Sequence, residues 1–96
     1  MRNTWIVSYD VCDAKRLRRV FKVCKGRGVH LQYSVFECDL DPREKAEFEA
    51  KLREEINDDE DQVLFVDLGS AEGRGNRVIH AIGRPYYSMD APCYAL

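Results

Sequence analysis

The sequence predicts one α+β domain in which an antiparallel sheet carries two helices. Three observations support this class: a β-branched and aromatic run at Thr4–Asp10, helical spacing of the apolar residues from Leu17 to Cys24, and a second helix signal at Asp41. Ninety-six residues, 45% of them apolar, suffice for one small domain. No stretch approaches the roughly 18 apolar residues that a membrane span requires.

The four cysteines are scattered and form no C-x-x-C pair, which favours reduced thiols over the dense disulfides of a secreted protein. The N-terminus runs directly into the first predicted strand, without the charged and apolar regions of an export signal. We therefore expect a cytoplasmic protein with no membrane segment.

Helix signals define two segments. Asp13 can cap a helix that stops within Lys25–Gly28, where glycine is expected to provide a left-handed C-cap. The run Asp41–Glu44 combines an Asp cap, a proline at the first position and a Glu three residues after the cap, so a second helix is predicted from there to about Ile56. The apolar stripes of the two helices are Leu17, Val20, Phe21 and Cys24, then Phe48, Leu52 and Ile56.

Strand signals define the other segments. After Thr4–Asp10, one long strand is predicted over Val29–Leu40, with a bulge near Val35-Phe36 where the apolar phase changes. A strand over Val63–Leu68 comes next. A glycine-rich hairpin over Gly69–Asn76 and a strand over Arg77–Ile82 follow.

These segments predict a ferredoxin-like βαββαβ domain spanning residues 1–96, whose helices cover one face of an antiparallel sheet. The strands are apolar on both faces, so the second face requires a cover. A homodimer that stacks sheet on sheet provides one. The tail, about residues 84–96, is expected to add a short extra strand to the partner's sheet.

Asp10 is the candidate metal ligand. Alternation places Trp5, Val7 and Tyr9 on one face of the first strand and Ile6, Ser8 and Asp10 on the other. One carboxylate is a poor magnesium site, and a structural role in capping or ion pairing is a strong alternative. Two Asp10 side chains at a symmetric dimer interface would repel each other, which favours binding of a cation or sharing of a proton. Ser8 lies on the Asp10 face and Ser34 could approach it across the strands.

Charge is strongly segregated although the net charge is only −2. Residues 15–27 hold seven bases and no acid, whereas residues 37–61 hold twelve acids and four bases. A basic helix is often only a solvated face, but this one lacks the i, i+4 ion pairs of an ordinary surface helix. Salt-dependent phosphate binding is the interpretation we prefer. The predicted nucleic-acid-binding residues are Lys15, Arg16, Arg18, Arg19, Lys22 and Arg27.

Weaker signals are set aside. His30, His80 and the cysteines have no zinc-ligand spacing. Tyr33 and Phe36 could suggest a base-stacking RNA-recognition module, but the glycine-aromatic pattern of its third strand is missing. The segment Gly73–Asn76 is interpreted as a turn first and a nucleic-acid contact second.

Four segments together carry a resemblance: Ser8–Asp10, Arg16–Val20, Gln32–Glu37, and Ile82-Gly83-x-Pro85. With them the chain resembles, over essentially its whole length, the small CRISPR-associated adaptation nucleases of the Cas-two family. These proteins work beside the Cas-one integrase in antiviral defence. The Q-x-S-V-F-E stretch together with a strand-terminal Y-D is specific for this family, whereas neither is specific alone.

The resemblance implies a homodimer in which the two Asp10 side chains face each other and bind Mg²⁺, with Mn²⁺ as a substitute. It implies metal-dependent endonuclease activity on single-stranded RNA or double-stranded DNA. It also implies that the dimer bridges the integrase and holds spacer DNA. Tyr9 matches the position beside the metal carboxylate and Phe36 a position near the site, so the candidate catalytic residues are Asp10, Tyr9, Ser8 and Phe36. Arg16, Arg18 and Arg19 match basic positions expected to contact phosphates.

Three alternatives stay open at this point. The first is a non-catalytic scaffold that bridges DNA in the same complex. The second is a toxin-type ribonuclease of the virulence-associated D family, which shares the fold. The third is a small-molecule regulatory domain, which the basic helix disfavours.

Overall fold

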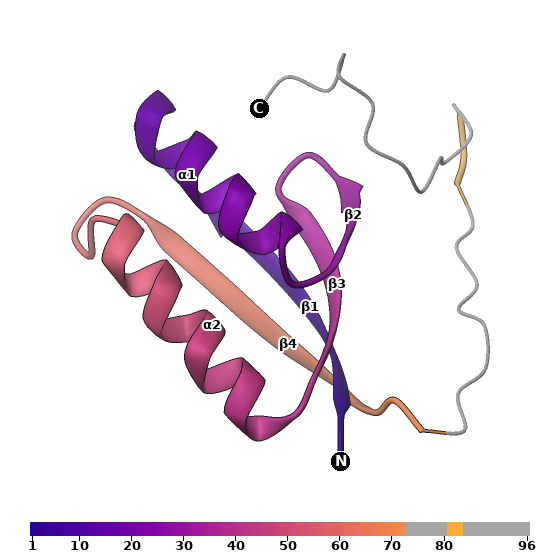
Figure 1. The fold of residues 1–96 in the computed structure, drawn as a ribbon. Helices are drawn as coiled ribbons and strands as arrows, with labels where there is room; N and C mark the ends of the chain where they lie inside the picture. Colours follow the sequence, from indigo (N-terminus) through magenta and orange to yellow (C-terminus); the bar gives the residue numbers. More distant parts are fainter. Residues whose placement is uncertain (73–80, 84–96) are drawn as a thin grey trace.

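The computed structural model describes residues 1–72 and 81–83 of the chain (Figure 1). Its elements are, in order, β1 (Asn3–Asp10), α1 (Ala14–Lys25), β2 (Val29–Gln32), β3 (Val35–Leu40), α2 (Pro42–Glu55) and β4 (Gln62–Ser70). The strands form one antiparallel sheet in the order β2-β3-β1-β4. This is the predicted ferredoxin-like βαββαβ arrangement, with β1 in the middle of the sheet and β4 at one edge.

Residues 29–40 form a β-hairpin, so the prediction of one long bulged strand is wrong. The chain turns at Tyr33 and Ser34, and Tyr33 has a positive φ of 38°. The change of apolar phase therefore marks a turn, because the chain reverses between two strands that both face the core. This one segment supplies both middle strands of the βαββαβ pattern. The predicted segments, taken in order, gave β-α-β-α-β-β, so the predicted fold class is confirmed although its second pair of strands was assigned to the wrong residues.

The C-terminal predictions are only partly covered by the described residues. β4 continues to Ser70, so Gly69 belongs to a strand and not to the predicted hairpin connection. Of the predicted strand Arg77–Ile82, residues 77–80 lie outside the described part, and the described residues 81–83 are not in a strand. The predicted tail strand at about 84–96 also lies outside it.

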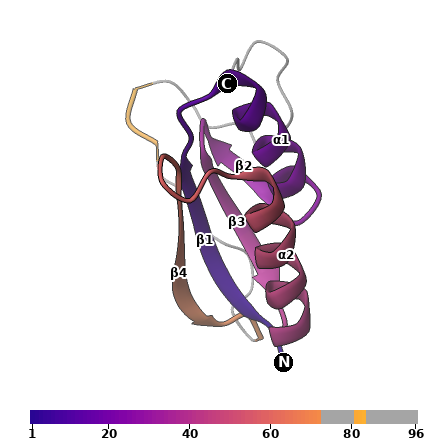
Figure 2. The ribbon, with the colours of Figure 1, turned by 90° about the vertical axis from the view of Figure 1, so that its left-hand side faces the viewer.

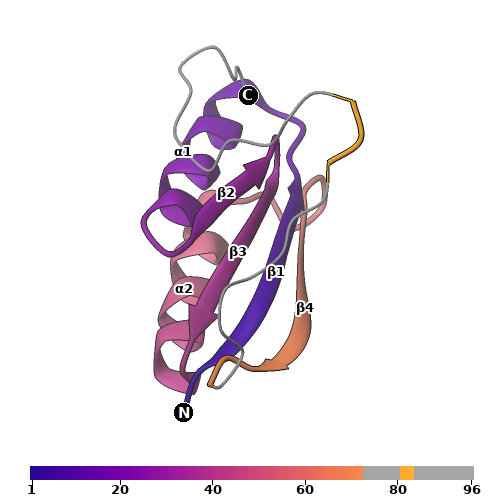
Figure 3. The same ribbon diagram turned by 90° about the vertical axis from the view of Figure 1, so that its right-hand side faces the viewer.

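Both helices cover the same face of the sheet (Figures 2 and 3). On this face Val7 of β1 lies between Phe36 of β3 and Phe65 of β4, and all three side chains point toward the helices. Phe65 in turn meets Phe48 of α2, with ring centroids 5.5 Å apart. The buried apolar core comprises Val7, Tyr9, Val20, Cys24, Phe36, Cys38, Leu40, Phe48 and Leu52.

The ends of the helices follow largely from local sequence. Asp13 caps α1 by accepting a hydrogen bond from the Arg16 amide, and Asp41 and Glu44 form the predicted capping box of α2. The left-handed C-cap predicted for α1 is wrong, because Gly26 has a right-handed φ of −73°. Neither helix in the described part of the chain is long and apolar enough to cross a membrane.

Candidate functional site

Asp10 is the last residue of β1 and its side chain is exposed. It pairs with Gln62, the first residue of β4, and therefore shares the face of the sheet that lies opposite the helices. On the β3 side the paired register of β1 ends earlier, at Ser8 and Val35, followed by a 3.2 Å hydrogen bond from the Tyr9 amide to the Ser34 carbonyl. Asp10 is thus held in the sheet from the β4 side.

The face that carries Asp10 is apolar along β4. Leu64, Val66 and Leu68 are 50%, 48% and 46% exposed, which is high for three large apolar side chains in one row. Ile6 of β1 pairs with Val66 and extends the row across the sheet. We call Ile6, Leu64, Val66 and Leu68 the open-face cluster. One surface therefore combines an exposed carboxylate at its end with an apolar patch suited to burial against another surface.

The donor set around Asp10 in one chain is too small for a magnesium site. Among the described residues no group of three His, Cys, Asp or Glu side chains gathers closely enough to hold a metal ion. Magnesium binds through one or two carboxylates and keeps several waters, so a single exposed Asp10 is insufficient and a pair contributed by two chains would fit.

Tyr9 and Phe36, two of the candidate catalytic residues, lie on the helix side of the sheet. Phe36 is fully buried and Tyr9 nearly so, and their rings stack with centroids 6.3 Å apart. Burial raises the pKa of the Tyr9 phenol well above its ordinary value of 10.0, and its buried hydroxyl has no hydrogen-bond partner among the described residues. The structure thus separates both rings from Asp10 by the thickness of the sheet.

Ser8 shares the Asp10 face, as predicted, and is partly buried. The Tyr9–Ser34 backbone hydrogen bond places the β2–β3 turn beside the end of β1, so Ser34 lies near it, as expected from cross-strand pairing. Of the four candidate catalytic residues, the structure therefore groups Asp10 with Ser8.

The six predicted nucleic-acid-binding residues of α1 and the following turn divide into two sets. Arg16, Arg19 and Arg27 form ion pairs with acids of α2 and of the loop after it. The paired residues lie far apart in the sequence, so they do not show as i, i+4 pairs. Arg19 pairs with Glu55 at 2.9 Å, and Arg27 with Glu47 at 3.5 Å. The charge of these arginines is therefore largely balanced within the chain.

Lys15, Arg18 and Lys22 form the second set, which we call the free basic stripe. All three side chains are exposed, and none of them forms a hydrogen bond or ion pair with a described residue. Their spacing of three and four residues places them on one side of α1. They are the cations of the predicted nucleic-acid-binding set that remain available to a phosphate backbone.

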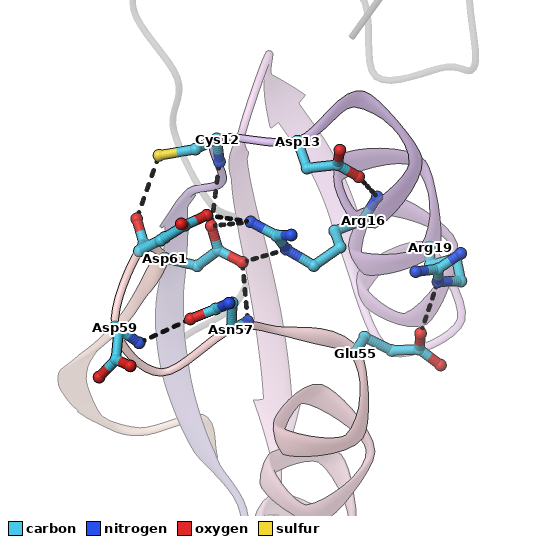
Figure 4. Close-up of polar contacts among 9 residues, drawn as sticks. Cys12, Asp13, Arg16, Arg19, Glu55, Asn57, Asp59 and Asp61 are labelled. Carbon is cyan, nitrogen blue, oxygen red and sulfur yellow. Dashed lines mark hydrogen bonds and ion pairs between the residues drawn. The ribbon is translucent and has the colours of Figure 1, made fainter.

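Asp61 is the main polar residue of the region that the sequence analysis did not single out. Its carboxylate accepts hydrogen bonds from Arg16 Nε at 2.7 Å, from the Cys12 amide at 3.0 Å and from the Asn57 amide at 2.9 Å (Figure 4). Its side chain is completely buried by these partners. The hydrogen bond from Arg16 holds the pKa of Asp61 well below its ordinary value. Its place in a run of acids concealed this role in the sequence.

Comparison with known proteins identifies the family. Residues 3–74 match the family described as CRISPR associated protein Cas2. Among curated relatives, the chain is 43% identical over 86 residues to the CRISPR-associated endoribonuclease Cas2 of Geobacter sulfurreducens, covering 90% of each chain. It is 35% identical over 88 residues to CRISPR-associated endoribonuclease Cas2 1 of Rhodospirillum rubrum, covering 92% of this chain and 85% of the relative.

A solved structure of this family has the same fold. The crystal structure of Streptococcus pyogenes Cas2 superposes with a TM-score of 0.66 at 33% identity, over 80% of this chain and 99% of the other. The family match covers three quarters of the chain and includes all its described helices and strands. The chain therefore belongs to the CRISPR-associated Cas2 family, the Cas-two family that its motifs resemble.

Proposed function

We propose that this chain is the subunit of a homodimeric, magnesium-dependent endonuclease that hydrolyses phosphodiester bonds of single-stranded RNA or double-stranded DNA. The names of its relatives support the endonuclease activity on RNA: those from Geobacter sulfurreducens and Rhodospirillum rubrum are CRISPR-associated endoribonucleases. The observation that carries the proposal is the exposed Asp10 carboxylate at the end of β1, on the same face as the open-face cluster.

The open-face cluster supports the homodimer. The side chains in this row are about half exposed. Burial of apolar surface contributes roughly 25 cal/mol for each Å² removed from water, so stacking a second copy on this face is favourable. An isologous dimer uses the same patch on both chains. It therefore brings two copies of Asp10 to one interface.

Asp10 of each copy would hold the magnesium ion, with manganese as a substitute. When bound, the ion supplies Lewis-acid activation of the phosphodiester. The chain itself binds and orients the substrate: the free basic stripe of Lys15, Arg18 and Lys22 contacts backbone phosphates. Ser8, on the Asp10 face, is placed to hydrogen-bond a water or phosphate oxygen there. Tyr9 and Phe36 support the site from the core, because their stacked rings fix the ends of β1 and β3.

In the cell we propose a cytoplasmic role in spacer acquisition. The dimer would bridge the Cas-one integrase and hold spacer DNA against its basic helices. This assignment rests on membership of the Cas2 family and on the free basic stripe.

A non-catalytic scaffold is the second candidate function. The observation that favours it is the small donor set, since Asp10 has no companion metal ligands among the described residues of its own chain. Such a scaffold would keep the dimer and the nucleic-acid contacts, and Asp10 would be an interface residue.

Cleavage by the purified dimer decides between the two. Single-stranded RNA and duplex DNA would be incubated with magnesium or with chelator, for the wild-type protein, Asp10→Asn and the control Asp58→Asn. The Asp58 side chain is exposed and has no hydrogen bond or ion pair with a described residue. Asp58→Asn therefore removes the same charge as Asp10→Asn without breaking a contact. Magnesium-dependent products that disappear only in Asp10→Asn establish the enzyme. Absence of products, with nucleic-acid binding unchanged in Asp10→Asn, establishes the scaffold.

A further inference from the structure

The two loops next to Asp10 are joined by one carboxylate. Residues 11–13 follow β1 directly, and residues 56–61 lead from α2 into β4, whose first residue, Gln62, pairs with Asp10. Asp61 immediately precedes Gln62 and accepts a hydrogen bond from the Cys12 amide, two residues beyond Asp10 (Figure 4). A second link between the loops runs from the Cys12 thiol, which donates to the Glu60 carbonyl at 3.1 Å.

Each carboxylate oxygen of Asp61 accepts two hydrogen bonds. Oδ1 accepts from the Cys12 amide and, at 3.1 Å, from an Arg16 terminal nitrogen. Oδ2 accepts from Arg16 Nε and from the Asn57 amide. The side chain is 0% exposed, so the two-nitrogen contact with Arg16 is shielded from solvent by the loops it connects.

Arg16 ties this carboxylate to α1. Its side chain is 19% exposed and also contacts Glu60 at 3.1 Å, while its backbone amide donates to the Asp13 cap. The pKa of Arg16 is raised chiefly by the hydrogen bond to Asp61. Arg16 is therefore engaged inside the chain, in contrast to Arg18, which is exposed and forms no ion pair with a described residue.

The end of β1 that carries Asp10 has few other contacts within the sheet. Asp10 is the last pair of the β1–β4 ladder, and the paired register with β3 ends two residues earlier. Strand ends fray unless something fixes them, and opening of the two loops would move Asp10 first. The Asp61 network ties the loop that follows Asp10 to the loop that precedes Gln62.

We propose that Asp61 is a positioning residue for the Asp10 carboxylate, and that Arg16 acts through Asp61 and not through a substrate phosphate. This inference rests on the proposed function for its catalytic consequence. Asparagine at position 61 offers only one acceptor oxygen, so at least two of the four hydrogen bonds cannot form. Asp10 then samples positions from which it cannot act, while substrate binding by the free basic stripe is preserved.

The test compares dimeric wild type, Asp61→Asn, Arg16→Lys, Asp58→Asn and Asp10→Ala. Arg16→Lys keeps the charge but cannot make the two-nitrogen contact. Asp58→Asn removes the same charge from the same loop without touching the network. Two readouts are taken on each folded variant: steady-state cleavage with magnesium, and hydrogen–deuterium exchange of the peptide that covers residues 9–13. If Asp61→Asn fails to fold, the same two readouts on Arg16→Lys decide whether the network positions Asp10.

The expected result is a fall in kcat of about tenfold to a hundredfold in Asp61→Asn, with KM changed less than about twofold. Exchange of residues 9–13 should become faster in Asp61→Asn and Arg16→Lys and stay at the wild-type rate in Asp58→Asn. Wild-type kcat and wild-type exchange in a folded Asp61→Asn protein overturn the positioning role and leave the proposed function intact.

Failure of the proposed function has a different signature. If the wild-type protein gives no magnesium-dependent products, or Asp10→Ala cleaves as well as wild type, the enzyme assignment fails. The positioning role is then decided by exchange alone. Faster exchange of residues 9–13 confined to Asp61→Asn and Arg16→Lys supports it, and unchanged exchange refutes it.

Discussion

Gly28 lies directly against Cys38: a Cβ atom at position 28 would come within 2.4 Å of the Cys38 sulfur and 2.5 Å of the Glu37 carbonyl oxygen. This close approach lets the chain enter β2 directly beside β3. The glycine is required for space and not for the left-handed C-cap that the sequence suggested. By contrast, a Cβ on Gly26 would meet nothing closer than 3.6 Å.

The two glycines should therefore respond oppositely to alanine. Gly28→Ala is expected to destabilise the protein by about 1–3 kcal/mol, because backbone and a buried sulfur must move. Gly26→Ala is expected to be neutral or to stabilise by up to about 1 kcal/mol, since its φ of −73° suits alanine. Urea unfolding followed by circular dichroism measures both. Equal effects of the two substitutions would show that packing against Cys38 is not what demands glycine.

A charge in the open-face cluster should dissociate the proposed homodimer. Val66 is 48% exposed, so Val66→Arg is tolerated within one chain but places a cation in the centre of the proposed interface. Ala50→Arg adds the same side chain to an exposed position of α2 and serves as the control. Sedimentation velocity should find Val66→Arg monomeric and Ala50→Arg dimeric. A dimer that persists in Val66→Arg would place the interface elsewhere.

Arg18 and Arg16 should differ in how they affect nucleic-acid binding. Arg18→Gln is expected to weaken binding to duplex DNA. It should also make the negative slope of log K against log salt less steep, by about 0.9 for each phosphate that is no longer neutralised. Arg16→Gln should leave this slope unchanged, because the Arg16 guanidinium is held by Asp61 and Glu60. Fluorescence anisotropy over a salt series measures both slopes. A less steep slope in Arg16→Gln would mean that Arg16 leaves Asp61 to bind phosphate.

The Asp61 network should make stability sensitive to acid. The pKa of Asp61 is lowered in the folded state, mainly by the hydrogen bond from Arg16, so its contribution is complete above the ordinary pKa of 3.8 and is lost as the pH falls toward the folded value. The difference in Tm between wild type and Asp61→Asn should be largest from about pH 5 to 7 and shrink below about pH 4. Calorimetry of both proteins across this pH range measures how the difference in Tm changes with pH. A difference that grows on acidification would contradict the assignment.

The described cysteines should react very differently with thiol reagents. Burial raises the pKa of the Cys24 and Cys38 thiols to about 12, whereas Cys12 is exposed. In a Cys93→Ser background at about pH 8, one equivalent is expected to react rapidly and two only as the protein unfolds. Mass spectrometry of the modified peptides should assign the rapid site to Cys12. Rapid modification of Cys24 would indicate that α1 opens locally.

Local signals account for much of what the sequence predicted correctly. The Asp13 cap, the capping box at Asp41 and the helical apolar stripes each depend on residues within one or two turns of each other. The alternation of β1 likewise placed Asp10 and Tyr9 on opposite faces. The hairpin at Tyr33 was missed because the turn contains no glycine and uses a tyrosine with positive φ, a conformation that tyrosine rarely adopts.

The sequence by itself determined the fold class, the family motifs and the place of Asp10 at the end of a strand, since all three depend on short-range pattern. Only the tertiary structure decided which charges are compensated. Arg16 and Asp61 are separated by 45 residues, and Arg19 and Glu55 by 36, so no helical spacing could pair them. They meet because α1 and α2 pack side by side on one face of the sheet, and burial of the Asp61 carboxylate there requires a cation. A basic helix that looked uniform is thereby divided into arginines that hold the fold and cations that face solvent.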